Sequence, residues 1–434
     1  MRTELVPDEV CLDIMGRMPV KSVVRFMCLN KSWQSLILDN SLYLNDLHSF
    51  HHNKSGTSCN YLVNRRIRPV LPLLLAAADD DEERANDNDS TYKGKLGSPY
   101  MCLSLHDGRS LMQYEELDNP CMGKSCTIII GSYNGLVLVM DDDSGLYLWN
   151  PSIRKVKALP ARSGPDCERP LIGFGFCQTN KNFKVVYMVT LFDPGTGEMA
   201  SQDVDVYSLA SDSWESLSTH ETTTLVPLGP HDYHCHITFD GNPHWLVQKK
   251  EDDTMFIVSF DFDSNQFRTI SKEQLPVLYG GAGEGLRLVG SMHLCTYKDM
   301  VCILRRTRRF QDSDLDSVLI VDCEVWVLKG YYGSTGSSSV DESSSWSLVQ
   351  VLLLRDLPYG GIPLDVFTHD GHLLLLDLCH TDAIISAETT NNDNDDHPPS
   401  AVFKQHKIFP HHYHVEATLA MQQMFSYTDS LFLL

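Results

Sequence analysis

The sequence predicts an α+β multidomain chain in which a short three-helix module precedes a large all-β domain, a β-propeller of about six blades. Two observations carry this prediction. Apolar residues recur at helical spacing before residue 48, and the pattern changes to period-two alternation with frequent turns after residue 96. One strand–turn–strand unit also recurs in the second region. A pair of β-sandwiches is the alternative, because the units are unequally spaced.

Length and composition limit the classes of function. The 434 residues suit a short module and one large domain. The apolar fraction is 42%, and no run approaches the roughly 20 apolar residues that cross a bilayer. The net charge of -22 would repel nucleic-acid phosphates and anionic lipid. We therefore expect a soluble chain with no nucleic-acid or membrane partner.

The cysteines and the first residues indicate a compartment. The 13 cysteines include no Cys-x-x-Cys pair, which favours free thiols over a disulfide framework. Residues 1–8 carry Glu4 and Asp8 and lack the apolar stretch of a secretory signal. We expect the chain in the cytoplasm, the nucleus or both.

Three short helices are expected in the first 48 residues. Pro7 suits the first turn of a helix and is followed by two acidic residues, and Pro19 opens the second helix. Asn30 is a suitable N-cap for the third helix. So short a segment cannot bury all of its large apolar groups, so some should face the following domain or a partner protein.

The helical region resembles the plant F-box pattern. The matching residues are 6–9, 17–22, 25–33 and 35–37, in the family's order and spacing. The resemblance implies docking onto a Skp-type adaptor, which ties the chain to a cullin scaffold. The adaptor-binding residues that it implies are Pro7, Ile14, Pro19, Val20, Val24 and Leu29. Trp33 also matches the motif, but we assign it to the core of the helices.

A linker is expected between the two parts. Residues 49–95 contain the acidic, poorly apolar runs 79–83 and 86–89. Such a segment cannot bury enough apolar surface to offset its ordering entropy, so it should be partly disordered. The expected division is an F-box at 1–48, a linker at 49–95 and the β domain at 96–434.

The recurring unit of the β domain is an apolar strand, a polar turn and a second strand. Its copies span residues 146–160, 204–217, 257–270 and 324–352, the last with a Gly/Ser-rich insert at 330–345. Glycine-led strands at 131–136, 173–176 and 240–245 precede several copies. Such repeats favour blades around an axis. We expect residues 425–434 to supply a last strand that completes the first blade.

The β domain is similar to the F-box-associated domain of plant receptors. The matching residues, in the family's order, are 131–135, 148–152, 173–176, 183–186, 206–208, 244–245, 259–261, 324–327 and 427–431. The resemblance implies a domain that recruits the protein to be ubiquitinated, with a ligand that differs from member to member.

Other candidate sites favour structural roles. The histidines at 231, 234 and 236, and those at 411, 412 and 414, lack an accompanying cysteine pair or His–Glu spacing, so we expect no metal. The arginine cluster at 305–309 is expected on a solvated loop or strand edge. Trp149, Trp214 and Trp245 are assigned to blade packing, with carbohydrate stacking as the alternative.

The leading hypothesis is a non-catalytic substrate-recognition subunit of a Skp–cullin–F-box (SCF) type ubiquitin ligase, without a cofactor, that binds an unknown substrate protein. A sugar-binding F-box receptor that selects glycosylated proteins is the alternative and would need a cluster of exposed tryptophans. A propeller enzyme would need carboxylates converging on the axis, and the sequence contains no such set.

Overall fold

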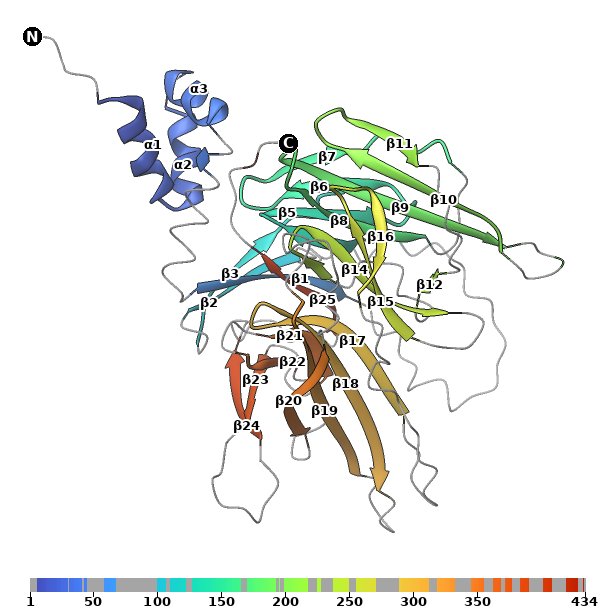
Figure 1. Cartoon of the computed structure of the whole chain (residues 1–434). Coiled ribbons are helices and arrows are strands. Elements are labelled where there is room, and N and C mark those ends of the chain that lie inside the picture. Colours follow the sequence, from blue (N-terminus) through green and yellow to red (C-terminus); the bar gives the residue numbers. More distant parts are fainter. Residues whose placement is uncertain are drawn as a thin grey trace, which may run out of the picture.

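The computed structural model describes the residues that form the helices, the strands and their shorter connections. These are residues 6–29, 31–40, 43–44, 58–67, 100–106, 110–121, 127–164, 170–192, 195, 199–217, 225–227, 237–249, 255–270, 289–311, 318–331, 345–354, 362–367, 371–376, 383–389, 401–407, 419–427 and 432. The helices form one body and the strands another (Figure 1). Within the described part, no helix is long and apolar enough to cross a membrane.

Several expected features lie outside the described residues. They are the acidic runs at 79–83 and 86–89, both histidine groups, residues 332–344 of the Gly/Ser-rich insert and the expected N-cap Asn30.

The helical module, residues 6–44, contains α1 (Asp8–Gly16), α2 (Val20–Met27) and α3 (Lys31–Asp39). Pro7 and Pro19 stand directly before α1 and α2, and Asp8 and Glu9 occupy the first turn of α1. The buried core of the module consists of Leu12, Met15, Val20, Val23, Ile37 and Leu44. Trp33 packs against this core, as expected, with its ring 5.6 Å from that of Phe26.

The described strands of the β domain form six antiparallel sheets, which we call blades. Blade 1 contains β25 (Leu419–Tyr427), β1 (Ser58–Ile67), β2 (Tyr100–His106) and β3 (Ser110–Leu117). Blade 2 contains β4 (Thr127–Tyr133), β5 (Leu136–Asp141), β6 (Leu146–Asn150) and β7 (Lys155–Ala158). Blade 3 contains β8 (Leu171–Cys177), β9 (Asn182–Phe192), β10 (Met199–Ser208) and β11 (Ser213–Leu217).

The other three blades follow in chain order. Blade 4 contains β12 (Leu225–Pro227), β13 (Ile237–Phe239), β14 (Asn242–Lys249), β15 (Met255–Asp261) and β16 (Gln266–Thr269). Blade 5 contains β17 (Val289–Tyr297), β18 (Met300–Gln311), β19 (Val318–Lys329) and β20 (Ser345–Leu354). Blade 6 contains β21 (Ile362–Phe367), β22 (Leu373–Leu376), β23 (Ala383–Thr389) and β24 (Ala401–Lys407).

The six blades close into a ring. The strand β25 contacts β4, β4 contacts β8, and β8 contacts β13 and β14; β17 then contacts blade 4 and β21, which contacts β25 again. The propeller of about six blades is therefore confirmed, and the alternative of two sandwiches is wrong.

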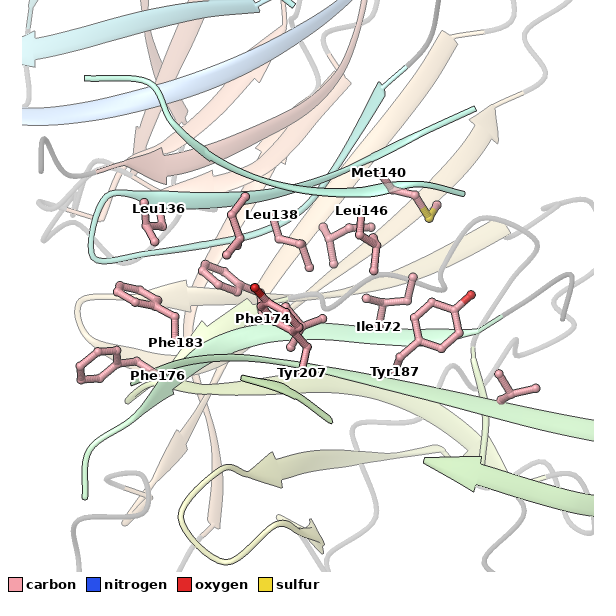
Figure 2. Packing of buried hydrophobic residues seen from close by; sticks show 14 residues of the cluster. Leu136, Leu138, Met140, Leu146, Ile172, Phe174, Phe176, Phe183, Tyr187 and Tyr207 are labelled. Carbon is pink, nitrogen blue, oxygen red and sulfur yellow. The ribbon is translucent and has the colours of Figure 1, made fainter. Parts of the chain in front are cut away.

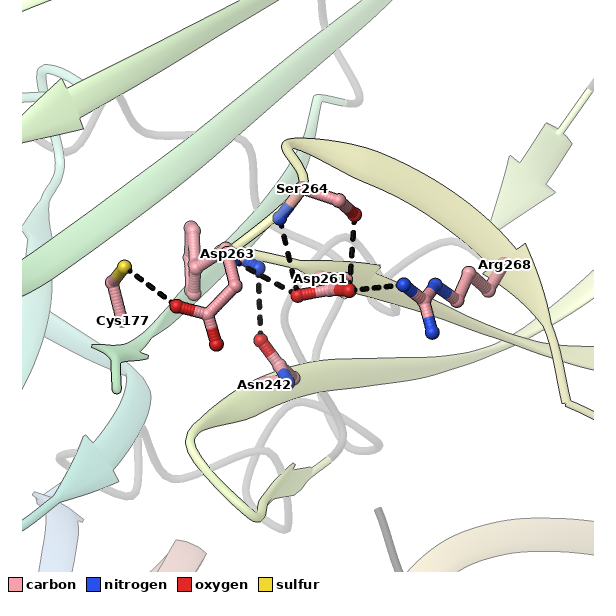
Figure 3. Close-up of polar contacts among 7 residues, drawn as sticks. Cys177, Asn242, Asp261, Asp263, Ser264 and Arg268 are labelled. Atoms are coloured by element: carbon pink, nitrogen blue, oxygen red, sulfur yellow. Dashed lines mark hydrogen bonds and ion pairs between the residues drawn. The ribbon is translucent and has the colours of Figure 1, made fainter. Parts of the chain in front are cut away.

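The four sequence repeats are the outer halves of blades 2 to 5. They coincide with the hairpins β6–β7, β10–β11, β15–β16 and β19–β20. In blade 4 the turn of this hairpin is held by side chains (Figure 3). Asn242 Oδ1 accepts from the backbone N–H of Phe262, and Asp261 Oδ1 accepts from that of Asp263. The thiol of Cys177 in blade 3 donates to Asp263 Oδ1 at 2.9 Å, so this turn also joins two blades.

The apolar core lies between neighbouring blades (Figure 2). Leu136 and Leu138 of blade 2 face Phe174 and Phe183 of blade 3, whose rings stack at 5.7 Å. Successive residues of a strand point to opposite faces of the sheet. Each blade can therefore pack one apolar face against the preceding blade and the other against the following blade.

Two expectations about where the domain begins and closes are corrected. The strand β1 falls inside the expected linker, yet it pairs with β2 on one side and β25 on the other. The propeller therefore starts before residue 96. The strand β25 completes blade 1, as expected of a last strand, but it covers residues 419–427 rather than 425–434. Ring closure joins segments at opposite ends of the sequence, so no local pattern marks its register.

The predicted position of the arginine cluster is also corrected. The cluster lies on β18, a central strand of blade 5 that is paired with β17 on one side and β19 on the other. It therefore lies neither in a loop nor at a sheet edge. Arg306 is buried, and Arg305 forms a 2.8 Å ion pair with Glu324 on the neighbouring strand. The opposing carboxylate explains how a half-buried guanidinium is accommodated here.

A buried histidine joins blades 4 and 5. His244 on β14 has no exposed surface, and its Nδ1 lies 2.9 Å from the carbonyl oxygen of Asn242. Its Nε2 lies 2.8 Å from the hydroxyl of Tyr331, which follows β19. The Nδ1–H therefore donates to the carbonyl, and the tyrosine hydroxyl donates to Nε2. Burial lowers the pKa of His244 from 6.5 to about 4.

Acidification from pH 7 to 5 is expected to lower the free energy of unfolding by roughly 1–2 kcal/mol through His244. The unfolded chain protonates this imidazole near its ordinary pKa, whereas the folded chain keeps it neutral until about pH 4, so protonation favours unfolding between these values. Urea denaturation of wild type and His244→Gln at both pH values measures the effect. An equal loss of stability on acidification in the two proteins would show that His244 has no part in it.

Candidate functional site

The helical module exposes several large apolar side chains. Among the described residues, the large apolar side chains that are exposed in the module are Val6 (55%), Val10 (46%), Ile14 (52%), Leu29 (67%) and Tyr43 (50%). In the part of the β domain whose side chains the structure describes, the exposed ones are Val156, Leu348 and Val349. An apolar group of this kind on a small module is typical of a protein-interaction site.

The helix α1 positions the main part of this surface. Val10 and Ile14 are spaced four residues apart, which places them on one side of the helix, and Val6 lies just before its N-cap, Pro7. Leu12 and Met15 point into the core of the module instead. The same helix therefore has a buried apolar side and an exposed one. We call the exposed residues Val6, Val10 and Ile14, together with Leu29 after the end of α2, the apolar face.

Charged groups border the apolar face. Asp8 and Glu9 are exposed in the first turn of α1, and Arg17 pairs with Asp13 at 3.1 Å near its end. Both side chains of this pair are largely exposed, so it adds little stability. An apolar centre with a charged rim suits reversible protein docking.

The structure separates the six predicted contact residues into two groups. Pro7, Ile14, Pro19 and Leu29 are exposed. Val20 is 3% exposed and belongs to the core, while Val24 is partly buried against it. The assignment of Val20 to a partner surface is therefore corrected. Positions 20, 23 and 24 share the helix side that packs on α1 and α3, and periodicity alone does not tell which apolar side is covered.

The sequence interpretation missed Val6 and Val10. For Val10 the signal was its four-residue spacing from Ile14, a second apolar stripe beside the one formed by Leu12 and Met15. Val6 precedes the helix, so helical spacing gives no signal for it. A helix with two apolar stripes needs two partners.

The tryptophans of the β domain bear on the sugar-binding alternative. Trp149 and Trp245 are buried at 3% and 1% exposure, and Trp214 is partly buried and donates to the carbonyl oxygen of Pro160. These tryptophans thus serve blade packing, as predicted, and offer no platform for a sugar ring.

The buried carboxylates of the β domain are held within separate blades. Asp141 accepts from the Tyr147 hydroxyl in blade 2, and Asp261 pairs with Arg268 in blade 4. Asp205 of blade 3 pairs with Arg162 at 2.7 Å, both nearly buried. None of the three lies on an innermost strand, so they do not converge on the axis. In the described part of the chain, no three His, Cys, Asp or Glu side chains are grouped to hold a metal ion.

Comparison with known families matches both parts of the chain. The profile of the F-box associated beta propeller domain matches residues 105–432, and that of the F-box domain matches residues 4–45.

Individual relatives agree with these matches. The Arabidopsis thaliana F-box/kelch-repeat protein At3g23880 is 22% identical over 75% of this chain and 76% of its own length. The F-box protein At3g07870 of the same plant is 23% identical over 62% of this chain and 60% of its own length, so the chain spans less than two thirds of that relative. A solved structure of SapL1 lectin with alpha methyl fucoside aligns over 72% of this chain and 93% of its own, at 12% identity and a TM-score of 0.32. A TM-score this low does not indicate a shared function.

Proposed function

Since the chain belongs to the family with an F-box associated β-propeller domain, preceded by an F-box, we propose that it is a substrate-recognition subunit of an SCF type ubiquitin ligase. In this role the F-box binds a Skp-type adaptor and thereby a cullin scaffold, and the propeller binds a substrate protein that is then ubiquitinated and degraded.

The apolar face is the observation that carries the proposal. Val6, Val10, Ile14 and Leu29 remain exposed after the module has folded. Leaving such groups in water is unfavourable by about 25 cal/mol per Å² of apolar surface, so a partner that covers them gains binding free energy. We assign the adaptor contact to this face together with Pro7 and Pro19, and we leave Val20 in the core.

The propeller supplies recognition without chemistry. Holding a substrate lysine close to a charged ubiquitin-conjugating enzyme raises its effective concentration, so the receptor needs no catalytic residue of its own. We also propose a cytoplasmic or nuclear location. Free cysteines in the described part, among them Cys28, Cys177 and Cys302, support a reducing compartment.

The double variant Ile14→Asp/Leu29→Asp is expected to bind a purified Skp-type adaptor at least about 100-fold more weakly than wild type. Each aspartate would be buried without a partner against the apolar surface of the adaptor. Its melting temperature should stay close to that of wild type, because both side chains are already more than half exposed in the free chain. Calorimetric titration and thermal unfolding of the same preparations measure the two effects.

Two controls separate docking from folding. Val156→Asp places one aspartate at an exposed apolar position of β7 and should leave adaptor binding unchanged. Val20→Asp should unfold the helical module, since this side chain lies in its core. Wild-type adaptor affinity in the double variant would remove the support for the receptor role.

A further inference from the structure

The helical module and the propeller share a packing contact. Ile153, in the turn between β6 and β7, packs against the core of the three helices. Among the described residues of that cluster, it is the one member that comes from outside the module. The F-box therefore rests on a defined point of blade 2.

Asn150 holds the turn that carries Ile153. The Asn150 side chain has no exposed surface, and its Oδ1 accepts from the backbone N–H of Ser152 at 3.0 Å. Arg154 completes the turn with a positive φ of 54°. The Nδ2 of Asn150 donates to the carbonyl oxygen of Phe432 at 2.9 Å, which joins positions 282 residues apart. One buried amide thus connects the turn to the segment after β25.

Phe432 is anchored in the core between blades 2 and 3. Its ring lies 4.6 Å from that of Phe183 at an interplanar angle of 73°, a favourable edge-to-face pair. It packs against the same cluster that fills the space between these blades in Figure 2. With its ring in this core and its carbonyl on Asn150, the residue is fixed at two points.

We propose that Phe432 is an intramolecular clasp that holds the β6–β7 turn and so fixes the orientation of the F-box on the propeller. The Phe432 ring holds the carbonyl that Asn150 binds, and a buried amide that loses a partner is destabilised. Loss of the ring should therefore loosen the turn and with it the seat of Ile153. In a ligase this orientation sets the distance from bound substrate to the conjugating enzyme. That consequence rests on the proposed function, whereas the clasp itself does not.

The width of the distance distribution between the two bodies tests the clasp. Spin labels are introduced as noncanonical amino acids at Gln34 on α3 and Glu215 on β11, both exposed, and measured in the full chain by pulsed dipolar spectroscopy. The distribution should be narrow in wild type and at least about twofold broader in Phe432→Ala and in Asn150→Asp. The aspartate keeps the acceptor for Ser152 and replaces the donor to Phe432 with an oxygen.

A matched control and a second route complete the test. Phe267→Ala removes an edge-to-face pair with Phe260, 4.8 Å away in blade 4, and should leave the distribution narrow. Ile153→Ser removes the docking contact while keeping the clasp, so it should broaden the distribution without lowering the melting temperature of the propeller. If Phe432→Ala and Asn150→Asp do not fold, Ile153→Ser alone tests the proposal.

The outcomes distinguish the clasp from the receptor role. A distribution as narrow as wild type in Ile153→Ser, or in folded Phe432→Ala, overturns the clasp. Equal broadening of the distance distribution in Phe267→Ala and Phe432→Ala also overturns it. General loosening of the propeller would then explain the broadening without a clasp. Adaptor affinity should be unchanged in all clasp variants, since the apolar face is intact, so failure of the proposed function would appear only in the adaptor titration.

Discussion

Deletion of residues 419–434 is expected to abolish cooperative unfolding of the propeller. These residues include β25, the innermost strand of blade 1, which pairs with β1 from Asn60↔Tyr427 to Ile67↔Leu419. The same strand contacts β4 and β21, its neighbours on the ring. Without it, β1 presents an open edge, and blades 2 and 6 lose their shared neighbour.

Urea unfolding followed by near-ultraviolet circular dichroism and by gel filtration measures this loss. A shorter deletion of residues 429–434 is the control, because it leaves β25 in place and removes Phe432. It should keep one cooperative transition with a stability lower by about 2–4 kcal/mol, a little below the roughly 3–5 kcal/mol lost with a fully buried phenylalanine, because Phe432 is partly buried. A normal transition in the longer deletion would mean that the ring closes without β25.

Gly175→Ala is expected to lower the free energy of unfolding by at least about 3 kcal/mol. A Cβ at this position of β8 would overlap the carbonyl oxygen of Gly241 and lie 2.9 Å from the ring of Phe262. The first neighbour is backbone and cannot turn away. The same carbonyl accepts a 2.7 Å hydrogen bond from the N–H of Phe176, so moving it would break the contact between blades 3 and 4.

Gly131→Ala is the matched control, because it adds the same methyl group to the innermost strand of the neighbouring blade. There the nearest atom is the hydroxyl oxygen of Thr238 at 3.4 Å, an ordinary contact, so the cost should be below about 1 kcal/mol. Comparison of the urea midpoints of the two variants measures the difference. Equal midpoints would contradict the close approach of Gly241 to β8.

The turns of the inner hairpins show how much of the fold is local. Asn134 and Gly135 between β4 and β5 both have positive φ, as do Asp240 and Gly241 between β13 and β14. Such turns need residues that tolerate the left-handed region, so Asn-Gly and Asp-Gly mark them in the sequence. The strand–turn–strand repeats were recognisable for the same reason.

The sequence by itself determined the three helices, the repeated hairpins and the order of the two domains, because helix periodicity, strand alternation and turn chemistry act within a few residues. Only the tertiary structure decided what covers each apolar side. It buried Val20, left Ile14 exposed, and placed Arg305 on an inner strand opposite Glu324. It also joined β1 to β25 and Asn150 to Phe432. Burial and ring closure depend on contacts between segments that are far apart in the sequence. A local pattern shows that one side of a helix or strand is apolar, but it does not show which segment packs against that side.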